Sequence, residues 1–542
     1  MNKITRRKAL QLGAGVGGAL LLPMTVQKSA YAATAGSPQP TPFEIELPIP
    51  NTLTPDFTDG TTDYYEIRIR KAQREILPGL MTEIWGYNGV SPGPIIKQRQ
   101  NRESLVRFIN KLGTPTTIHL HGMASLPQYD GYAEDLIPPN YYKNYIYPNN
   151  RAATIWYHDH ALRETARNVY MGLAGMYIVQ DDLELGLPLP KDEYDVPLII
   201  QDKIFAADGS LIFDDNDRRR LMGDIILVNG APWPRMRVAN RKYRFRLLNA
   251  SNSRAYKLAL STGDDLIVIG TDAGLVGSPI PTPNLRIGPA ERYEFVIDFS
   301  QYPIGTQIVL QNLPLPNNTD FDGTNRVMRF DVVRAENDNS SIPSTLRPFV
   351  PIPPSSAIRE RRWTFERRNN RWEINGKVWN KNRVDANPGV DDVERWTVIT
   401  NSRNWFHPVH VHLVDFQIIR RNLQPPLPYE RGWKDVVYVG EDDNIQIIAR
   451  FGPHRGKYMM HCHNTVHEDH DMMTQFEVGQ GGPDPITTAP PQPLPAPPLR
   501  SIRGAIQSSQ TQRRLEEAQT QPLMYDLEKI EEFDNKVYRE GI

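Results

Sequence analysis

One short pattern occurs three times along the chain: a strand-like run of alternating apolar and polar residues that ends in asparagine. The copies end at Asn110, Asn249 and Asn401, which lie 139 and 152 residues apart. Spacings of this size suit a β-sandwich repeated three times. The 47 prolines and 37 glycines agree, because proline interrupts helices and glycine serves turns. We therefore predict an all-β protein, with a short helix at residues 162–170 as the main exception before the C-terminal tail.

The chain of 542 residues is too long for a single hydrophobic core, and the repeats divide it into three domains. We place domain one at residues 40–185, domain two at 190–345 and domain three at 350–482. His-x-His motifs follow the first and third copies of the repeat, whereas none follows the second. Domains one and three are therefore expected to carry the chemistry, and domain two to be structural. A proline-rich linker and a polar C-terminal tail follow at residues 483–542.

The second copy of the repeat shows the alternation clearly. Tyr243, Phe245 and Leu247 alternate with Arg244 and Arg246. Successive side chains of a strand point to opposite faces, so this pattern predicts a half-buried strand.

Ten of the 12 histidines gather in four clusters. Residues i and i+2 of a strand face the same way, so each His-x-His pair presents two imidazoles to one point. Imidazoles this dense would repel one another when protonated unless a metal holds them neutral, so the clusters predict metal sites. The clusters are His119 and His121; His158 and His160; His407, His410 and His412; and His461, His463 and His467.

Cys462 is the only cysteine, so no intrachain disulfide can form, and it lies between two of these histidines, His461 and His463. Along a strand the two imidazoles would face one side and the thiolate the other. This segment is therefore predicted to join two metal sites, with covalent bonds as the electron path.

The side chains of His407, His467 and Met472 are available to complete a site around Cys462. Two imidazoles, a thiolate and a long axial thioether describe an electron-transfer copper of the blue type. Zinc is the competing interpretation, but zinc is redox-silent and has no use for a thioether. The other eight histidines suit three coppers, and because they come from domains one and three, we expect that cluster to bridge these two domains.

Together these motifs resemble the four copper motifs of the multicopper oxidases, over about residues 40–480. A narrower likeness to the bilirubin oxidases and the bacterial spore-coat laccases lies in residues 130–135, 228–234 and 467–473. The resemblance implies three cupredoxin-like Greek-key β-sandwich domains and four coppers per chain: one type 1, one type 2 and a type 3 pair. It also implies an enzyme that oxidises bilirubin-like tetrapyrroles, phenols and aromatic amines one electron at a time and reduces dioxygen to water.

The resemblance, carried over motif by motif, assigns a ligand to every copper. The type 1 copper would be bound by His407, Cys462, His467 and Met472, the type 2 copper by His119 and His410, and the type 3 pair by His121, His158, His160, His412, His461 and His463. Every ligand position of the family is filled.

Dioxygen reduction also needs four protons, and two carboxylates are candidates to supply them. The resemblance places Asp130 and Glu468 near the three-copper cluster as proton relays. General acids of this kind need pKa values near the working pH. The alternative for Asp130 is that it caps the turn before Gly131.

Two other functions suit the same fold. A cuprous oxidase for copper detoxification often carries a methionine-rich segment, since thioethers suit Cu(I), whereas no methionine occurs between Met328 and Met459. A non-catalytic periplasmic scaffold needs no copper ligands, whereas this chain has a full set.

The first 32 residues have the features of an export signal. Arg6 and Arg7 precede an apolar, glycine-containing run, and residues 30–32 offer a cleavage site before Ala33. The run is too short and too rich in glycine for a stable membrane span. The arginine pair resembles a twin-arginine signal, which implies that twin-arginine export machinery delivers the folded protein to the periplasm or beyond the cell. An ordinary secretory signal is the alternative.

The formal charge is near zero, with 62 basic and 63 acidic residues. This balance argues against nucleic acid and anionic membranes as partners. We expect a monomer whose partners are a small-molecule electron donor and dioxygen.

Overall fold

A computed structural model describes residues 36–216, 221–484 and 486–487. The chain divides into two units after residue 36, and every element named below belongs to the second unit. The predicted export signal and the tail beyond residue 487 lie outside the described residues. Within the described ranges, no helix is both long and apolar enough to cross a membrane.

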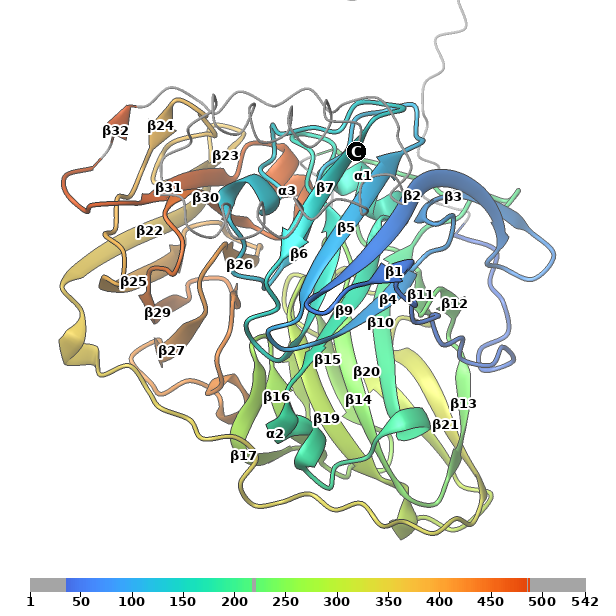
Figure 1. Ribbon diagram of the computed structural model, residues 1–542. Coiled ribbons are helices and arrows are strands. Elements are labelled where there is room, and N and C mark those ends of the chain that lie inside the picture. Colours follow the sequence, from blue (N-terminus) through green and yellow to red (C-terminus); the bar gives the residue numbers. More distant parts are fainter. Residues whose placement is uncertain (1–35, 217–220, 485, 488–542) are drawn as a thin grey trace, which may run out of the picture. The chain divides into compact units, whose positions relative to one another are not determined.

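The first group of strands forms two sheets around one core (Figure 1). One sheet has the order β1-β2-β5-β7 with β3 beside β2, and the other has the order β4-β9-β8-β6. Side chains from both sheets, including Tyr87, Phe108 and Tyr157, fill the space between them. The strands are β1 (Phe57–Thr58), β2 (Thr62–Glu75), β3 (Met81–Tyr87), β4 (Gly93–Arg99), β5 (Glu103–Asn110), β6 (Ile118–His121), β7 (Tyr142–Tyr147), β8 (Ala153–Asp159) and β9 (Ala174–Gln180).

The second group forms a larger pair of sheets. Their orders are β12-β11-β10-β14-β19-β16-β17 and β13-β21-β20-β15-β18, and Phe245, Phe295 and Phe330 lie in the core that they share. The strands are β10 (Asp195–Lys203), β11 (Ile225–Val228), β12 (Ala231–Pro232), β13 (Arg235–Ala239), β14 (Lys242–Asn249), β15 (Tyr256–Leu260), β16 (Leu266–Thr271), β17 (Gly274–Thr282), β18 (Leu285–Ile287), β19 (Arg292–Asp298), β20 (Gln307–Asn312) and β21 (Arg326–Arg334).

The third group repeats the arrangement. Its sheets have the orders β23-β22-β25-β29-β27 and β28-β26-β30-β31, and Cys462 and Met472 lie in its core. The start of the predicted linker pairs with this group, as β32 runs antiparallel to β24. The strands are β22 (Arg359–Arg368), β23 (Arg371–Ile374), β24 (Arg383–Val384), β25 (Val393–Thr400), β26 (His407–Val411), β27 (Phe416–Arg421), β28 (Val436–Val439), β29 (Asn444–Arg450), β30 (Gly456–Cys462), β31 (Met473–Val478) and β32 (Ile486–Thr487).

These sheets confirm the all-β prediction, since α-helix in the described part of the chain is limited to three short segments: α1 (Thr165–Met171), α2 (Asp182–Gly186) and α3 (Thr465–Asp469). The helix predicted at residues 162–170 is α1, which begins three residues later than expected. The reason is a cap from outside the segment, because the Asp469 carboxylate accepts hydrogen bonds from the first backbone N–H groups of α1, at 3.1 and 2.8 Å.

The repeated pattern occupies equivalent strands in the three groups. Each copy (β5, β14 and β25) has a parallel strand on one side and an antiparallel strand on the other. The Asn110 and Asn249 side chains both accept a hydrogen bond from the backbone two residues later, which fixes the turn that follows the strand. In the third copy the strand ends at Thr400, whose hydroxyl takes this role, so Asn401 lies one position beyond the equivalent site.

The prediction that β14 is only half-buried is wrong, because nearly all of its residues are buried. Arg244 and Arg246 are buried and pair with Glu184 and Glu294. Arg246 also donates to the hydroxyl of Thr154 on β8, at 2.9 Å. The charged face therefore lies against the first group of sheets, where the carboxylates compensate the buried charge.

Candidate metal centre

Four buried strands, with the residues that directly follow three of them, carry eight of the predicted histidines to one place. In the first group, β6 pairs with β8 so that His119 lies opposite His158. In the third group, β26 pairs with β30 so that His410 lies opposite His461. Figure 1 shows β6 and β26 facing each other across the boundary between the two groups.

Eight imidazoles converge at this boundary. The Nε2 atoms of His119 and His410 lie 3.3 Å apart. The Nε2 atom of His461 lies 3.2 Å from that of His160 and 3.1 Å from that of His412. The cluster therefore joins ligand-type side chains from the first and third groups of sheets.

The eight rings form three sets of three, with His121 in two of them. Within each set, one nitrogen atom from each ring lies within 4.8 Å of the other two. This spacing allows one ion to sit between the members of each set. The sets are His119, His121 and His410; His121, His158 and His463; and His160, His412 and His461.

A fourth site surrounds Cys462. Its sulfur lies 3.3 Å from Nδ1 of His407 and 3.6 Å from Nδ1 of His467. His461 and His463, on either side of the cysteine, belong to the eight-ring cluster, as alternation along a strand predicts.

Hydrogen bonds within residues 462–472 position His467 and Met472 beside Cys462. The Asn464 side chain caps α3 by accepting from the backbone N–H groups of Val466 and His467, which places His467 on the first turn. The backbone N–H of Cys462 donates to the carbonyl of Met472 at 3.2 Å, so this methionine lies beside the cysteine in the same core.

The donor set of the cluster fits metal ions. His463 is buried and neither of its ring nitrogens has a hydrogen-bond partner among the described residues; the same holds for Nδ1 of His121 and Nε2 of His158. Buried polar atoms of this kind are rare without a ligand. Burial and the nearby histidines hold the pKa of His463 well below its ordinary value, so the ring is neutral and its lone pair is available.

The Cys462 site also fits a metal ion, of a softer kind. Burial raises the pKa of the Cys462 thiol well above its usual value, and burial lowers the pKa of His407 to about 3. The imidazole is thus neutral, while the thiolate needs a cation beside it to form. A soft thiolate with two imidazoles suits copper.

Asp130 orients two rings of the cluster. Its carboxylate Oδ2 accepts a hydrogen bond from Nδ1 of His412 at 2.7 Å, and its backbone carbonyl accepts from Nδ1 of His119 at 2.5 Å. Both contacts leave Nε2 of the ring free of a proton. Burial raises the pKa of Asp130 well above its ordinary value.

Glu468 joins rings from the two groups of sheets. Its carboxylate oxygens lie 3.1 Å from Nδ1 of His461 and 3.5 Å from Nδ1 of His160. Burial alone would raise the pKa of Glu468, but attraction and hydrogen bonding to these histidines hold it below its usual value.

Sequence analysis missed two residues that contact these rings, Trp372 and Asp435, and a third, Arg292, that contacts Asp435. Trp372 stacks on His467, with ring centroids 3.7 Å apart. Asp435 contacts His121, and Arg292 of the second group pairs with Asp435. Each comes from a strand or loop far from the histidine motifs along the chain, so no spacing pattern indicates it.

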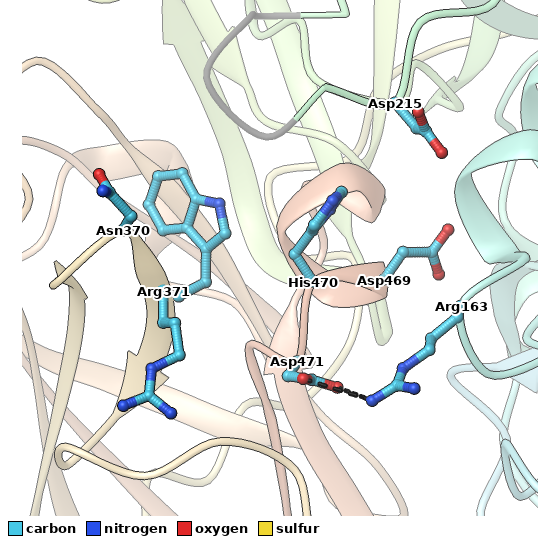
Figure 2. A pocket seen from close by; sticks show the side chains of 8 residues that line it. Arg163, Asp215, Asn370, Arg371, Asp469, His470 and Asp471 are labelled. Atoms are coloured by element: carbon cyan, nitrogen blue, oxygen red, sulfur yellow. Dashed lines mark hydrogen bonds and ion pairs between the residues drawn. The ribbon is translucent and has the colours of Figure 1, made fainter.

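A cavity of about 390 Å³ lies beside the Cys462 site (Figure 2). Trp372 and His470 line it, and Figure 2 shows Arg163 directed at Asp471, which it contacts at 3.1 Å. His470 is partly buried, and its Nδ1 lies 2.7 Å from the carbonyl of Val466. The lining residues are Arg163, Asp215, Asn370, Arg371, Trp372, Asp469, His470 and Asp471.

Comparison with known proteins agrees with this geometry. Sequence models of a family described as multicopper oxidase match residues 68–184, 207–327 and 351–482. A bilirubin oxidase from Albifimbria verrucaria is 42% identical over 469 residues, covering 81% of this chain and 82% of its own. A laccase from Bacillus stratosphericus is 36% identical over 513 residues, covering 81% and 99%. The crystal structure of a multi-copper oxidase from Pediococcus acidilactici matches with a TM-score of 0.76 and 30% identity, covering 85% of this chain and 97% of that one.

The chain belongs to the multicopper oxidase family, and its three groups of sheets are cupredoxin-like domains. It is an oxidase with copper as cofactor, small-molecule electron donors and dioxygen as the acceptor. Within the family, its relatives include a bilirubin oxidase and laccases.

Proposed function

We propose that the chain binds four copper ions and couples one-electron oxidation of organic donors to four-electron reduction of dioxygen to water. One ion would lie at Cys462 as type 1 copper, held by His407, Cys462, His467 and Met472. The other three would lie in the eight-ring cluster, with His119 and His410 holding type 2 copper and His121, His158, His160, His412, His461 and His463 holding the type 3 pair. Bound copper supplies the one-electron chemistry and the storage of four electrons.

The observation that carries this proposal is the continuity of the segment from His461 to His463. Its middle side chain belongs to the Cys462 site and its outer two belong to the cluster. The two sites are therefore joined by a few covalent bonds through one piece of backbone. This connection suits an enzyme that accepts electrons at one place and uses them at another.

Asp130 and Glu468 are proposed to hold and deliver protons at the cluster. Both are buried, and each lies against rings from domain three. The raised pKa of Asp130 favours its protonated form, which is the form that can donate. Asp130 also ends the short turn formed by residues 127–129, as the alternative interpretation expects. That role does not explain why its carboxylate accepts a hydrogen bond from His412.

We propose that donors bind in the cavity of Figure 2. Its volume of about 390 Å³ suits an aromatic ring system, and Trp372 connects it with His467 by direct stacking. Arginines and carboxylates on the cavity wall offer partners for polar substituents. Bilirubin-like tetrapyrroles, phenols and aromatic amines are the proposed donors, supported by the activities for which the bilirubin oxidase and laccase relatives are named.

The sequence supports export as a further part of the proposal. The twin-arginine-type signal, with cleavage before Ala33, would deliver a folded monomer to the periplasm or beyond the cell. A folding step before export suits a protein that must acquire its metal correctly.

Three measurements on the purified protein test the proposal. Mass spectrometry of metals should find about four coppers per chain, and the visible spectrum should show an intense blue band. Steady-state assays should show oxidation of bilirubin and a simple phenol with oxygen consumption. Turnover of Cu(I) but of neither organic donor would favour the cuprous oxidase, and a colourless, copper-free protein would favour the scaffold.

A further inference from the structure

Arg292, on β19 of the middle domain, contacts all three domains beside the histidine cluster. Its guanidinium has five N–H groups, and each has an acceptor. Three donate to the backbone carbonyls of Thr154, Ala290 and Asp272, at 3.2, 3.0 and 3.0 Å. The other two donate to the two carboxylate oxygens of Asp435, at 2.7 and 2.5 Å. A buried guanidinium with every donor used has little freedom to move.

Asp435 connects this guanidinium with two rings of the cluster. Its Oδ1 lies 3.1 Å from Nε2 of His121, and its backbone carbonyl accepts from Nδ1 of His410 at 2.8 Å. Because each ring gives its N–H to Asp435, the opposite nitrogen is left without a proton. Those nitrogens, Nδ1 of His121 and Nε2 of His410, are the atoms that face the cluster.

Gly122 leaves the space that the ion pair of Arg292 and Asp435 occupies, which is an observation independent of the hydrogen bonds. It directly follows His121 and has a φ of 95°. A Cβ atom at this position would lie 2.8 Å from Nη2 of Arg292 and 2.9 Å from Oδ2 of Asp435. Any larger residue would therefore push the ion pair away from the ring that it supports.

We propose that Arg292 is a positioning residue for copper loading of the cluster. Through Asp435 it fixes the orientation and the tautomer of His121 and His410, one ring from each terminal domain. The middle domain, which supplies no ligand, thereby controls how tightly the cluster holds copper. This inference rests on the proposed copper content of the cluster.

The test compares Arg292→Met and Arg292→Lys with the full-length wild-type protein, all loaded with copper under the same conditions. Metal analysis gives copper per chain, the blue band reports the Cys462 site, and a chelator gives the rate of copper removal. Arg292→Met should keep the blue band while losing cluster copper about 10- to 100-fold faster, the range typical for residues that orient metal ligands. Arg292→Lys should lose copper at a rate between those of the wild type and Arg292→Met, because an ammonium group cannot make all five contacts of the guanidinium.

Arg244→Met is the matched control, since Arg244 is an equally buried arginine of the same domain that pairs with Glu184 and Glu294 rather than with Asp435. It should lower thermal stability and leave the rate of copper removal unchanged. Equal copper loss in the Arg244 and Arg292 variants would overturn the proposal.

Asp435→Asn provides a second test if Arg292→Met does not fold. It keeps the shape of the side chain and an acceptor for His121 but removes the negative charge that pairs with Arg292. Faster copper removal is expected, and a wild-type rate would overturn the proposal. A wild-type protein without cluster copper would instead refute the proposed function.

Discussion

The indole of Trp372 lies face to face with the imidazole of His467, with centroids 3.7 Å apart and ring planes inclined by 24°. Trp372, which is itself fully buried, is among the residues that line the cavity proposed for donors. An electron leaving a molecule in that cavity would therefore meet Trp372 and His467 in turn. His467 is not among the residues that line the cavity, whereas Trp372 is, so the tryptophan connects His467 with the cavity wall.

Replacing Trp372 should impair donor oxidation more than it impairs copper binding. Trp372→Ala should lower the free energy of unfolding by about 3–5 kcal/mol through the cavity that it leaves, and Trp372→Phe by less. Both should lower kcat with organic donors at unchanged copper content. Trp363→Phe is the control, because Trp363 is buried in the same core and contacts Trp396 instead, with tilted ring planes and centroids 5.2 Å apart. Identical kinetics for Trp372→Phe and Trp363→Phe would contradict this role.

Cys462→Ser should remove the blue band and donor oxidation while the fold persists. A hydroxyl is a poor ligand for a soft copper site, so the copper content should fall by about one ion per chain. Circular dichroism should match the wild type, because serine is slightly smaller and can still accept from the N–H of Asn464, as the sulfur does. Retained turnover would show that the copper assignment is wrong.

Asp130→Asn and Glu468→Gln should slow oxygen reduction and spare donor oxidation. Loss of a positioned proton donor costs about 10²- to 10⁴-fold in rate. Without oxygen, a donor should bleach the blue band at the wild-type rate; when oxygen is added, the band should return slowly. Slow bleaching with a normal return would place these carboxylates on the donor side instead.

The copper-free protein should lose stability steeply as the pH falls below about 6.5. Burial holds the pKa of His407 at about 3 and that of His160 at about 4, whereas both titrate near 6.5 in the unfolded chain. The unfolded state thus binds more protons at acidic pH, and each such histidine removes about 1.4 kcal/mol of stability per pH unit between its two pKa values. This contribution is fully present above pH 6.5.

Denaturant unfolding of the copper-free protein at pH 7.5 and 5.5 measures this effect. His407→Gln should show a shallower pH dependence, by about one proton. Bound copper should suppress the effect, because a ligated imidazole cannot take up a proton. Equal stability of the copper-free protein at the two pH values would show that the histidines are not buried as neutral rings.

The placement of the histidines around Cys462 was predictable because it depends on a local rule. Alternation along a strand is enough to direct His461 and His463 to one side and Cys462 to the other, whatever the rest of the fold does. The same rule places His119 with His121. The repeat likewise indicated three domains, since equivalent strands keep equivalent hydrogen bonds at Asn110 and Asn249.

The supporting residues were not predictable, because they depend on how distant segments meet. Trp372 reaches His467 from β23, and Arg292 reaches Asp435 from a different domain. Arg244 and Arg246 carry the alternation of a surface strand, yet neighbouring carboxylates and a second domain cover them. A single sequence shows which side chains a strand presents, but not which surface another domain will cover.

The pairing of β30 has a consequence for engineering this protein. Cys462 lies opposite Val409 on β26, and His461 lies opposite both His410 and Met473. A slip of one residue would turn every side chain of β30 to the other face, so the sulfur would point into the imidazole cluster and the imidazoles into the hydrophobic core of the third group. An insertion of one residue upstream of His461 should thus exchange the two faces of β30 and separate Cys462 from His407 and His467. An insertion of two residues should keep each side chain on its present face.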